Sequence, residues 1–337
     1  GPAMYGAYLG TVPPGVDGRA ALEEVRRRVS GPDGPAPGTA EAALPYLQSD
    51  HMLVRFLVAR QWNVEQAATM LRVHYQWLAK TQMSELLLQP FPEEPQLRRY
   101  YPETYHGTDK HGRPVYIWQP GYIDMPRLMQ STTPERLMEY LFVNSELMIR
   151  RRLPACTLAQ GEVVDKSLNI IDLDNLGFFI ISDATAYRVL KEYTAAITNH
   201  YPETMGKVFI INAPRLFYTA WSVVKSLLDD KTKAKISIYG TDQRAYSKAL
   251  LEIIDRRQLP KLFGGTCVCD GKDPKSCMAT LKGPWMDPEI ARLVDSHPLE
   301  YLMTPEGAGL WHRCRPAHER GDGDAGGQQQ QQQQQQQ

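Results

Sequence analysis

The stretch that decides the fold is Tyr201-Pro-Glu-Thr-Met-Gly-Lys-Val-Phe-Ile-Ile-Asn-Ala-Pro214. Its centre, Lys207–Asn212, is a short run rich in Val, Ile and Phe that ends just before a proline, which is typical of a buried strand. Three further runs of this kind occur at Val115–Trp118, Ser167–Leu173 and Lys235–Tyr239. Because segments with helical periodicity separate these runs, the sequence predicts an α/β sheet covered by helices.

Helix signals lie before and between the predicted strands. One helix is expected at Asp17–Ser30, and another at Asn63–Lys80 with Asn63 as its N-cap. Thr133-Pro134-Glu135 combines a cap, a first-turn proline and a first-turn acid. A fourth helix is expected to begin near Ser182-Asp183. These segments predict a small helical lobe before the α/β region.

The segment from Pro214 to Asp229 has a different character, because it is apolar almost all round. At helical spacing it carries Phe217, Ala220, Trp221, Val224, Leu227 and Leu228. A helix of this kind is either deeply buried or in contact with an apolar molecule that is not protein. The residues alone leave two interpretations open, a core helix and a lid over a lipid cavity.

Composition limits the class of protein. Of the 337 residues 42% are hydrophobic, which is enough for a core and predicts one or two domains. Lys+Arg and Asp+Glu balance at 38 each, which argues against a nucleic-acid-binding protein. No apolar run approaches the ~18 residues of a membrane span, so any membrane contact is expected to be peripheral. The five cysteines and the lack of a recognisable signal peptide predict reduced thiols in a cytosolic protein.

Motifs for enzymatic chemistry are weak. The chain has no Gly-x-Ser-x-Gly elbow. Gly107 to Gly112 has the glycine spacing of a phosphate-binding loop but lacks its Lys-Ser/Thr, so Asp109-Lys-His-Gly112 is predicted to be a turn that leads into the Val115 strand. The glycines after Gly321 follow no strand and open no helix. We therefore expect no catalytic residues and no nucleotide cofactor.

The cysteines and histidines are the candidate metal ligands and general bases of the chain. Cys267-Val-Cys269 and Cys277 lie close in sequence, but the next histidine is His297 and no second ligand pair has zinc spacing. We expect ordinary loop thiols and no metal. His74 falls on the apolar face of its helix and is predicted to be a packed core histidine with its hydrogen bonds satisfied. His200 lacks a nucleophile or acid partner and is expected to be structural.

Several ordered motifs resemble the Sec-fourteen-like, or CRAL-TRIO, lipid-exchange family over Leu53 to Glu289. They are Arg55-Phe-Leu-Val-Ala-Arg60, the run from Tyr101 to Tyr116, Arg152-Leu-Pro-Ala-Cys156, the opening stretch above, Leu259-Pro-Lys-Leu-Phe-Gly-Gly265 and Gly283-Pro-Trp-Met-Asp-Pro288. Two of these loops are most similar to the fungal phosphatidylinositol/phosphatidylcholine transfer protein of the secretory pathway. The resemblance implies a mixed sheet covered by helices, with a hydrophobic pocket behind a gating helix and an all-helical N-lobe in front.

The predicted organisation follows from the motifs and from composition. Residues 1–38 hold a cleavage remnant, a helix and a linker, 39–92 the N-lobe, 93–290 the lipid domain, 291–320 a C-terminal extension and 321–337 a tail. The tail is rich in Gly, Asp and Gln and cannot bury apolar area, so it is predicted to be disordered.

The resemblance also implies a set of site residues. The phosphatidylinositol head group is matched by Arg60, Glu203, Thr232, Lys235, Ser167 and Asn169, and the phosphatidylcholine head group by Tyr105, Tyr116 and Ser167. Lys and Thr can donate to a phosphodiester, and Arg60 can pair with Glu203. Asn169 replaces a family threonine, and Ile197 replaces a serine of the choline set. The gate helix would present the six apolar residues named above.

The resemblance implies binding of a single phospholipid and its transfer between membranes, with no covalent chemistry and no cofactor. It also implies a monomer in the cytoplasm that binds transiently to Golgi or endosomal membranes. Lipid kinases are the expected partners. Two alternatives stay open: a sensor that presents lipid to a kinase, and a carrier of another apolar ligand such as a sterol, tocopherol, retinoid or squalene. An uncharged ligand would leave the cationic and anionic side chains poorly paired, which argues against the second.

Overall fold

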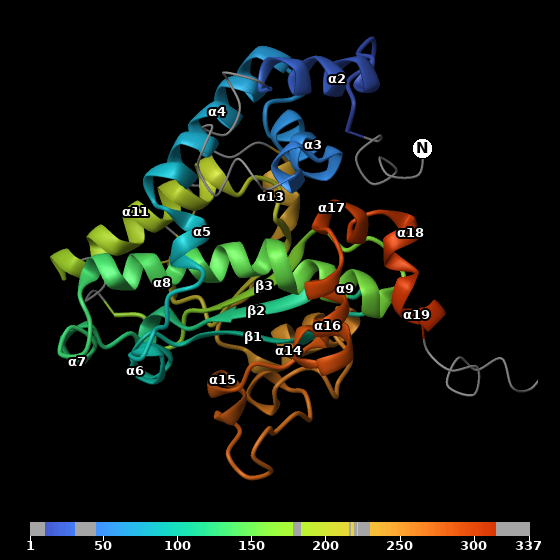
Figure 1. Cartoon of the computed structure of the whole chain (residues 1–337). Coiled ribbons are helices and arrows are strands. Elements are labelled where there is room, and N and C mark those ends of the chain that lie inside the picture. The colour runs from blue at the N-terminus through green and yellow to red at the C-terminus, as the bar shows by residue number, and fades with distance from the viewer. Residues whose placement is uncertain are drawn as a thin grey trace, which may run out of the picture.

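A five-stranded mixed sheet organises the molecule in this computed structural model (Figure 1), which describes residues 11–30, 45–177, 183–215, 217–218, 221 and 230–314. Its strands are β1 (Glu103–Thr108), β2 (Pro114–Trp118), β3 (Ser167–Asp172), β4 (Met205–Ile211) and β5 (Ile236–Ile238). They lie side by side in chain order. Strands β1 and β2 are antiparallel, whereas the pairs from β2 to β5 are parallel. The predicted mixed sheet is thus confirmed.

The strand predictions hold for four of these five strands. Strands β2 to β5 coincide with the four Val/Ile-rich runs. Strand β1 was not predicted, because Glu103-Thr-Tyr-His-Gly-Thr108 carries polar side chains where the pattern requires apolar ones. The predicted turn is present between β1 and β2, where the backbone N–H of Gly112 donates to the carbonyl of Asp109 at 3.0 Å.

The helices frame the sheet, with the following bounds. They are α2 (Gly18–Arg28), α3 (Asp50–Ala59), α4 (Val64–Lys80), α5 (Met83–Leu86), α6 (Glu94–Tyr100), α7 (Met125–Leu128), α8 (Pro134–Leu147), α9 (Leu153–Gln160), α11 (Ala184–His200), α13 (Asp230–Lys235), α14 (Gln243–Ile253), α15 (Ser276–Ala279), α16 (Pro288–Ser296), α17 (Leu299–Leu302), α18 (Pro305–Ala308) and α19 (Leu310–Cys314). The predicted caps are confirmed at Asn63 and Thr133, and α11 begins after Asp183, as expected. All three side chains accept a hydrogen bond from a first-turn backbone N–H.

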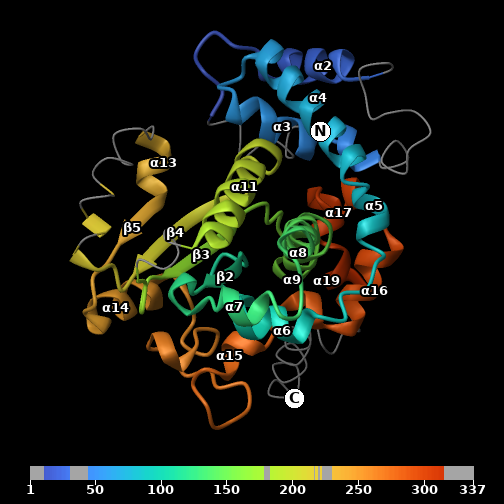
Figure 2. The ribbon, with the colours of Figure 1, turned by 90° about the vertical axis from the view of Figure 1, so that its left-hand side faces the viewer.

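The two faces of the sheet are covered differently. One face packs Val115, Ile170 and Phe209 against Tyr246 and Leu250 of α14 in a closed apolar core. The opposite face, here called the inner face, lies under α8 and α11 (Figure 2). Neighbours in register share a face, so the inner face carries Tyr105, Tyr116, Asn169, Val208 and Ile236 in one row across the sheet. Polar groups therefore lie on this face among apolar ones.

The N-terminal helices form a lobe above the inner face (Figure 1). Leu22 and Val25 of α2 pack into the same core as Leu53 of α3 and Leu71 of α4. Ion pairs of Arg26 with Asp50 and of Arg28 with Glu65 add to this contact. The first helix therefore belongs to the N-terminal lobe, where it packs on α3 and α4.

The C-terminal helices α16 to α19 lie against α9. Ile290, Leu293 and Leu302 share a buried cluster with Ala155 and Leu158 of α9. This packing gives structure to a part of the chain for which the sequence supported no prediction. The predicted linker within residues 32–38 and the glutamine tail lie outside the described residues.

Candidate functional site

One pair of predicted site residues is in direct contact. Lys235 ends α13 and lies directly before β5, while Glu203 lies in the turn between α11 and β4 with φ at +57°. The Lys235 Nζ donates to Glu203 Oε2 at 3.2 Å, and both side chains are partly exposed, at 29% and 21%. In a half-buried ion pair of this kind, either side chain can leave the other and bind a ligand group at a small cost in free energy.

Ser167 and Asn169 on β3 adjoin this pair. The Ser167 Oγ lies 3.0 Å from Asn169 Oδ1 and 3.2 Å from the carbonyl oxygen of Thr204, the residue after Glu203. Both side chains are buried on the inner face. Glu203, Lys235, Ser167 and Asn169 are called the outer polar cluster below.

Arg60 and Thr232 are the other predicted head-group residues. Arg60 is the C-cap of α3, and its Nη1 donates to the carbonyl of Ala59 at 3.4 Å. Glu203 is ion-paired with Lys235 in the described part of the chain, and the pairing of Arg60 with Glu203 in a lipid complex stays a prediction. Thr232 lies in α13, but its side chain is outside the described residues.

A second group of polar side chains lies further along the inner face. The rings of Tyr105 and Tyr116 are 5.1 Å apart, as expected for partners on adjacent antiparallel strands. The Tyr116 hydroxyl donates to Glu103 Oε2 at 2.6 Å. Asn144 of α8 donates from Nδ2 to the other carboxylate oxygen of Glu103 at 3.1 Å. The Glu103 carboxyl is therefore held from both sides.

Arg152 completes this group. It ends a π-helical segment, Met148–Arg152, between α8 and α9. Pro154 follows in the first turn of α9, where the missing N–H favours an irregular join. The guanidinium lies 4.2 Å from the centre of the Tyr105 ring and donates to the backbone carbonyl and to the side-chain oxygen of Asn144. Glu103, Tyr105, Tyr116, Asn144 and Arg152 are called the inner polar cluster below.

Burial shapes the electrostatics of the inner polar cluster. Desolvation raises the pKa of Glu103, against the opposing effect of the Tyr116 hydrogen bond. Desolvation also lowers the pKa of Arg152, while the tyrosine and carboxylate groups nearby oppose that shift. The charged form of Glu103 and that of Arg152 each cost free energy when buried without the other. The two side chains are therefore expected to affect stability together.

Glu103, Asn144 and Arg152 were missed as site residues from the sequence. Arg152 stood in a quoted family motif, but its role there was not assigned. Glu103 alternates with Tyr105 on the strand that was not predicted. If β1 is recognised as a strand, its alternation places the side chains of Glu103 and Tyr105 on the same face of the sheet.

Apolar side chains lie on the inner face beside Asn169 of the outer polar cluster. Val208 and Ile210 of β4 pack with Ile236 and Ile238 of β5, and Phe217 lies against them. The Phe217 and Trp221 rings, both from the predicted gate helix, stack with their centres 6.3 Å apart, and Phe217 covers the inner face near β5. Ala220, Val224, Leu227 and Leu228 lie outside the described residues.

The two histidines considered earlier meet where the N-terminal lobe joins α11. His74 and His200 have ring centres 5.7 Å apart, and Trp77 stacks on both. Burial lowers the pKa of His74 to about 3 and that of His200 to about 4. His74 is fully buried as predicted, but the prediction of satisfied hydrogen bonds is wrong, since neither ring nitrogen has a partner among the described residues.

A search of the described helices for a membrane span found none with the required length and apolar character.

Comparison with known proteins places the chain. The CRAL/TRIO domain model matches residues 98–265, and the CRAL/TRIO N-terminal domain model matches residues 21–72. The crystal structure of Sfh5 matches with a TM-score of 0.53 at 14% identity, over 83% of this chain and 96% of that one, which shows a shared fold.

Curated relatives extend the match. The phosphatidylinositol/phosphatidylcholine transfer protein SFH4 of Arabidopsis thaliana is 40% identical over 74% of this chain and 40% of its own length. The Sec14 cytosolic factor of Schizosaccharomyces pombe is 38% identical over 70% of this chain and 80% of its own. The SEC14 cytosolic factor of Candida glabrata is 36% identical over 76% and 89%. The chain thus spans less than half the length of SFH4 but most of the two fungal proteins, and it belongs to the Sec14-like family of CRAL/TRIO proteins.

Proposed function

We propose that this protein binds one phospholipid molecule at a time, phosphatidylinositol first and phosphatidylcholine second, and exchanges it between membranes. The relatives named for this activity support the proposal. The observation that carries it is the half-buried pair of Lys235 and Glu203 at the edge of an apolar sheet face. A head group that is both anionic and rich in hydroxyls needs a cation and an acceptor at the same place.

In the proposed complex the outer polar cluster holds the inositol phosphate. Lys235 would leave Glu203 and donate to the phosphodiester, while Glu203 accepts from sugar hydroxyls. Ser167 and Asn169 supply further polar groups on the same face. Arg60 and Thr232 belong to the proposed set through the family resemblance.

The inner polar cluster is the proposed position for a choline head group. Tyr105 and Tyr116 offer aromatic faces to a cation, and Arg152 brings a positive charge that suits the adjacent phosphate. Arg152 already lies over Tyr105, so a choline group has to approach the other ring or displace the guanidinium. Together with Ile197 in place of a serine, this favours phosphatidylinositol over phosphatidylcholine.

The proposed exchange needs no covalent step and no cofactor. The helix that carries Phe217 and Trp221 would open at a membrane surface, and acyl chains would enter against Val208, Ile210, Ile236 and Ile238. Each buried methylene contributes about 0.8 kcal/mol, which offsets its removal from the bilayer. We place the protein in the cytoplasm as a monomer in transient contact with Golgi or endosomal membranes, where a lipid kinase would receive the exchanged inositide.

Vesicle transfer assays test the proposal. Fluorescent phosphatidylinositol in donor vesicles should reach acceptor vesicles with the wild-type chain, and Lys235→Ala should lower that rate about tenfold, because a charge-assisted hydrogen bond contributes about 1.5–3 kcal/mol. Lys233→Ala is the matched control, since Lys233 lies on the same helix and pairs with Asp230, whose side chain is 98% exposed. This control should transfer like the wild type.

The outcomes separate the alternatives. Loss of inositide transfer in Lys235→Ala with choline-lipid transfer retained supports the head-group assignment. Equal losses in Lys233→Ala and Lys235→Ala would show that general surface charge is responsible. A wild-type chain that moves neither lipid would overturn the proposal, and mass spectrometry of the co-purified lipid would then identify another apolar ligand.

A further inference from the structure

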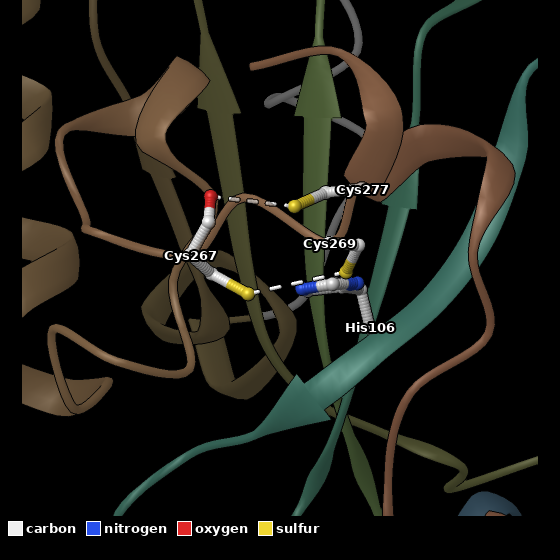
Figure 3. Close-up of side chains that lie close together, drawn as sticks. All are labelled: His106, Cys267, Cys269 and Cys277. Atoms are coloured by element: carbon white, nitrogen blue, oxygen red, sulfur yellow. Dashed lines mark hydrogen bonds between the residues drawn. The ribbon is translucent and has the colours of Figure 1, made fainter. Parts of the chain in front are cut away.

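Four side chains that play no part in the lipid site converge at the far end of β1 (Figure 3). Cys267, Cys269 and Cys277 come from the segment after the helical turn Lys261–Phe263, and His106 comes from β1. One ligand atom from each of the four lies within 4.8 Å of every other. No metal was expected from the sequence, because no histidine follows the cysteines closely, whereas in the structure the fourth donor, His106, lies far upstream.

The backbone aims His106 at the cysteines. The register of β1 with β2 shifts between Tyr105 and Thr108, and Gly107 has φ at +74°. His106 follows Tyr105, so strand alternation already places its side chain on the face opposite the inner face, where Leu259, Phe263 and Met278 pack. The Gly107 N–H donates to the carbonyl of Lys282 at 2.7 Å, which holds this part of β1 against the cysteine-bearing segment.

The His106 ring is arranged as a ligand rather than as a core side chain. It is fully buried, and its Nδ1 lies 3.4 Å from the carbonyl oxygen of Thr280. That contact places the proton on Nδ1 and leaves the lone pair on Nε2. Among the described residues Nε2 has no hydrogen-bond partner, although it is buried. A backbone carbonyl on the far nitrogen is the usual support for a metal-binding imidazole.

The spacing of the donors matches one metal ion. Zinc–sulfur bonds of about 2.3 Å put the sulfurs of a tetrahedral site about 3.8 Å apart. The Cys267 and Cys269 sulfurs are 4.0 Å apart, and all four ligand atoms lie within 4.8 Å of one another, so a contraction of at most about 1 Å between any two donors gives tetrahedral spacing. The four donors are too close together to surround a cluster of several iron and sulfur atoms. Three thiolates and an imidazole favour Zn²⁺ among common ions.

Charge balance supports the same conclusion. Three thiolates, a neutral imidazole and Zn²⁺ carry one net negative charge. Lys282 supplies the compensating charge, since its Nζ lies 3.2 Å from the Cys267 sulfur. Cys277 and His106 are buried, whereas Cys269 is exposed, so one side of the site is open to solvent for metal entry.

We propose that His106, Cys267, Cys269 and Cys277 bind one Zn²⁺ ion in a structural site that fixes the 266–282 segment to β1. Most side chains of residues 269–276 are exposed, so apolar burial contributes little to holding this loop. A metal that joins distant parts of the chain removes loop entropy from the unfolded state. The site also anchors the backbone next to Tyr105, whose carbonyl accepts from the Lys282 N–H at 3.2 Å.

Metal analysis of the full chain, purified without chelators, tests the proposal. The wild type should hold about one zinc per chain, and His106→Ala and Cys269→Ser should each hold less than about 0.2. His106→Cys should retain the metal, because a fourth thiolate completes a four-cysteine site. Cys314→Ser is the matched control, since Cys314 is exposed and lies outside the cluster, and it should keep the wild-type content.

A second measurement covers variants that fold poorly. Cobalt added to the metal-free wild type should give the intense absorption of a tetrahedral thiolate site, and one equivalent of zinc should abolish it. Lys282→Ala should fold and bind zinc about tenfold more weakly. The proposal is overturned if the wild type holds no zinc and shows no cobalt absorption, if Cys269→Ser keeps its zinc, or if mass spectrometry finds a Cys267–Cys269 disulfide in the purified chain.

Discussion

The inner and outer polar clusters lie on the same face of one sheet but are built in opposite ways. In the inner polar cluster the Glu103 carboxylate has two hydrogen-bond donors, and Arg152 has both Asn144 and the Tyr105 ring. In the outer polar cluster Lys235 and Glu203 share one contact of 3.2 Å and stay in reach of water. The inner groups are positioned before any ligand arrives, whereas the outer groups can be rearranged by one.

Because of this difference, removal of one charged side chain should cost more stability in the inner polar cluster than in the outer one. Removal of one charge from a closed, buried cluster leaves the other charge uncompensated in a medium of low dielectric. Removal of one charge from a partly exposed pair leaves a group that water can solvate. The inner polar cluster should therefore govern folding and the outer polar cluster should govern ligand exchange.

The largest expected effect is on stability, through Arg152→Ala. Loss of the guanidinium removes a nearby positive charge that favours the buried Glu103 carboxylate, and it leaves two Asn144 oxygens without their donor. We therefore expect the free energy of unfolding to fall by about 3–5 kcal/mol. Urea unfolding followed by tryptophan fluorescence measures the change. The matched control is the neighbour Arg151→Ala, whose partner is Asp295 on the surface, with side chains 48% and 55% exposed. It should cost less than about 1 kcal/mol. Equal costs for the two variants would show that Arg152 and Glu103 do not act as one unit.

The pH dependence of stability should distinguish the two clusters by a second, smaller effect, which is measured with Glu103→Gln. Because burial raises the pKa of Glu103 in the folded state above its ordinary value of 4.5, the folded chain holds this proton more tightly than the unfolded chain does. Its contribution to stability is present at low pH and is lost as pH rises through the folded pKa. The stability of Glu103→Gln relative to wild type should therefore increase with pH above 4.5, by up to about 1.4 kcal/mol per pH unit.

The control for this prediction comes from the outer polar cluster. Glu203→Gln changes a partly exposed carboxylate to an amide of the same shape, and water can solvate the Lys235 partner that it leaves, so the substitution should cost less than about 1 kcal/mol of stability. Urea unfolding at pH 5, 6, 7 and 8 supplies the comparison. A Glu103→Gln curve parallel to that of the wild type would show that the buried carboxyl does not titrate differently in the folded state.

The same contrast explains what the sequence could and could not predict. Strands β2 to β5 were predicted because their side chains are apolar for packing reasons. Strand β1 was missed because its side chains serve chemistry: Glu103 belongs to the inner polar cluster and His106 to the cysteine group. The pair of Lys235 with Glu203 joins residues far apart in the chain, so a family resemblance and not spacing brought them together. Sequence patterns for secondary structure fail where polar side chains of a candidate site replace the apolar side chains that the pattern requires.

The smallest expected effect tests whether the two clusters serve different lipids. Tyr116→Phe removes the hydroxyl that donates to Glu103 at 2.6 Å but keeps the ring beside Tyr105. We expect a stability loss of about 1 kcal/mol and a fivefold fall in phosphatidylcholine transfer, with phosphatidylinositol transfer nearly unchanged. Tyr122→Phe is the control, because its hydroxyl also bonds a carboxylate, that of Asp174, but at the surface.

Transfer of both lipids by each variant in the same vesicle assay makes the comparison decisive. A selective loss of phosphatidylcholine transfer requires the inner polar cluster to touch the choline lipid while the inositide is held elsewhere. Equal losses for the two lipids would mean that both head groups depend on Tyr116. The Lys235 variant would then lower both rates as well, because a single site would serve both lipids. The inner and outer polar clusters would in that case be two parts of one binding site.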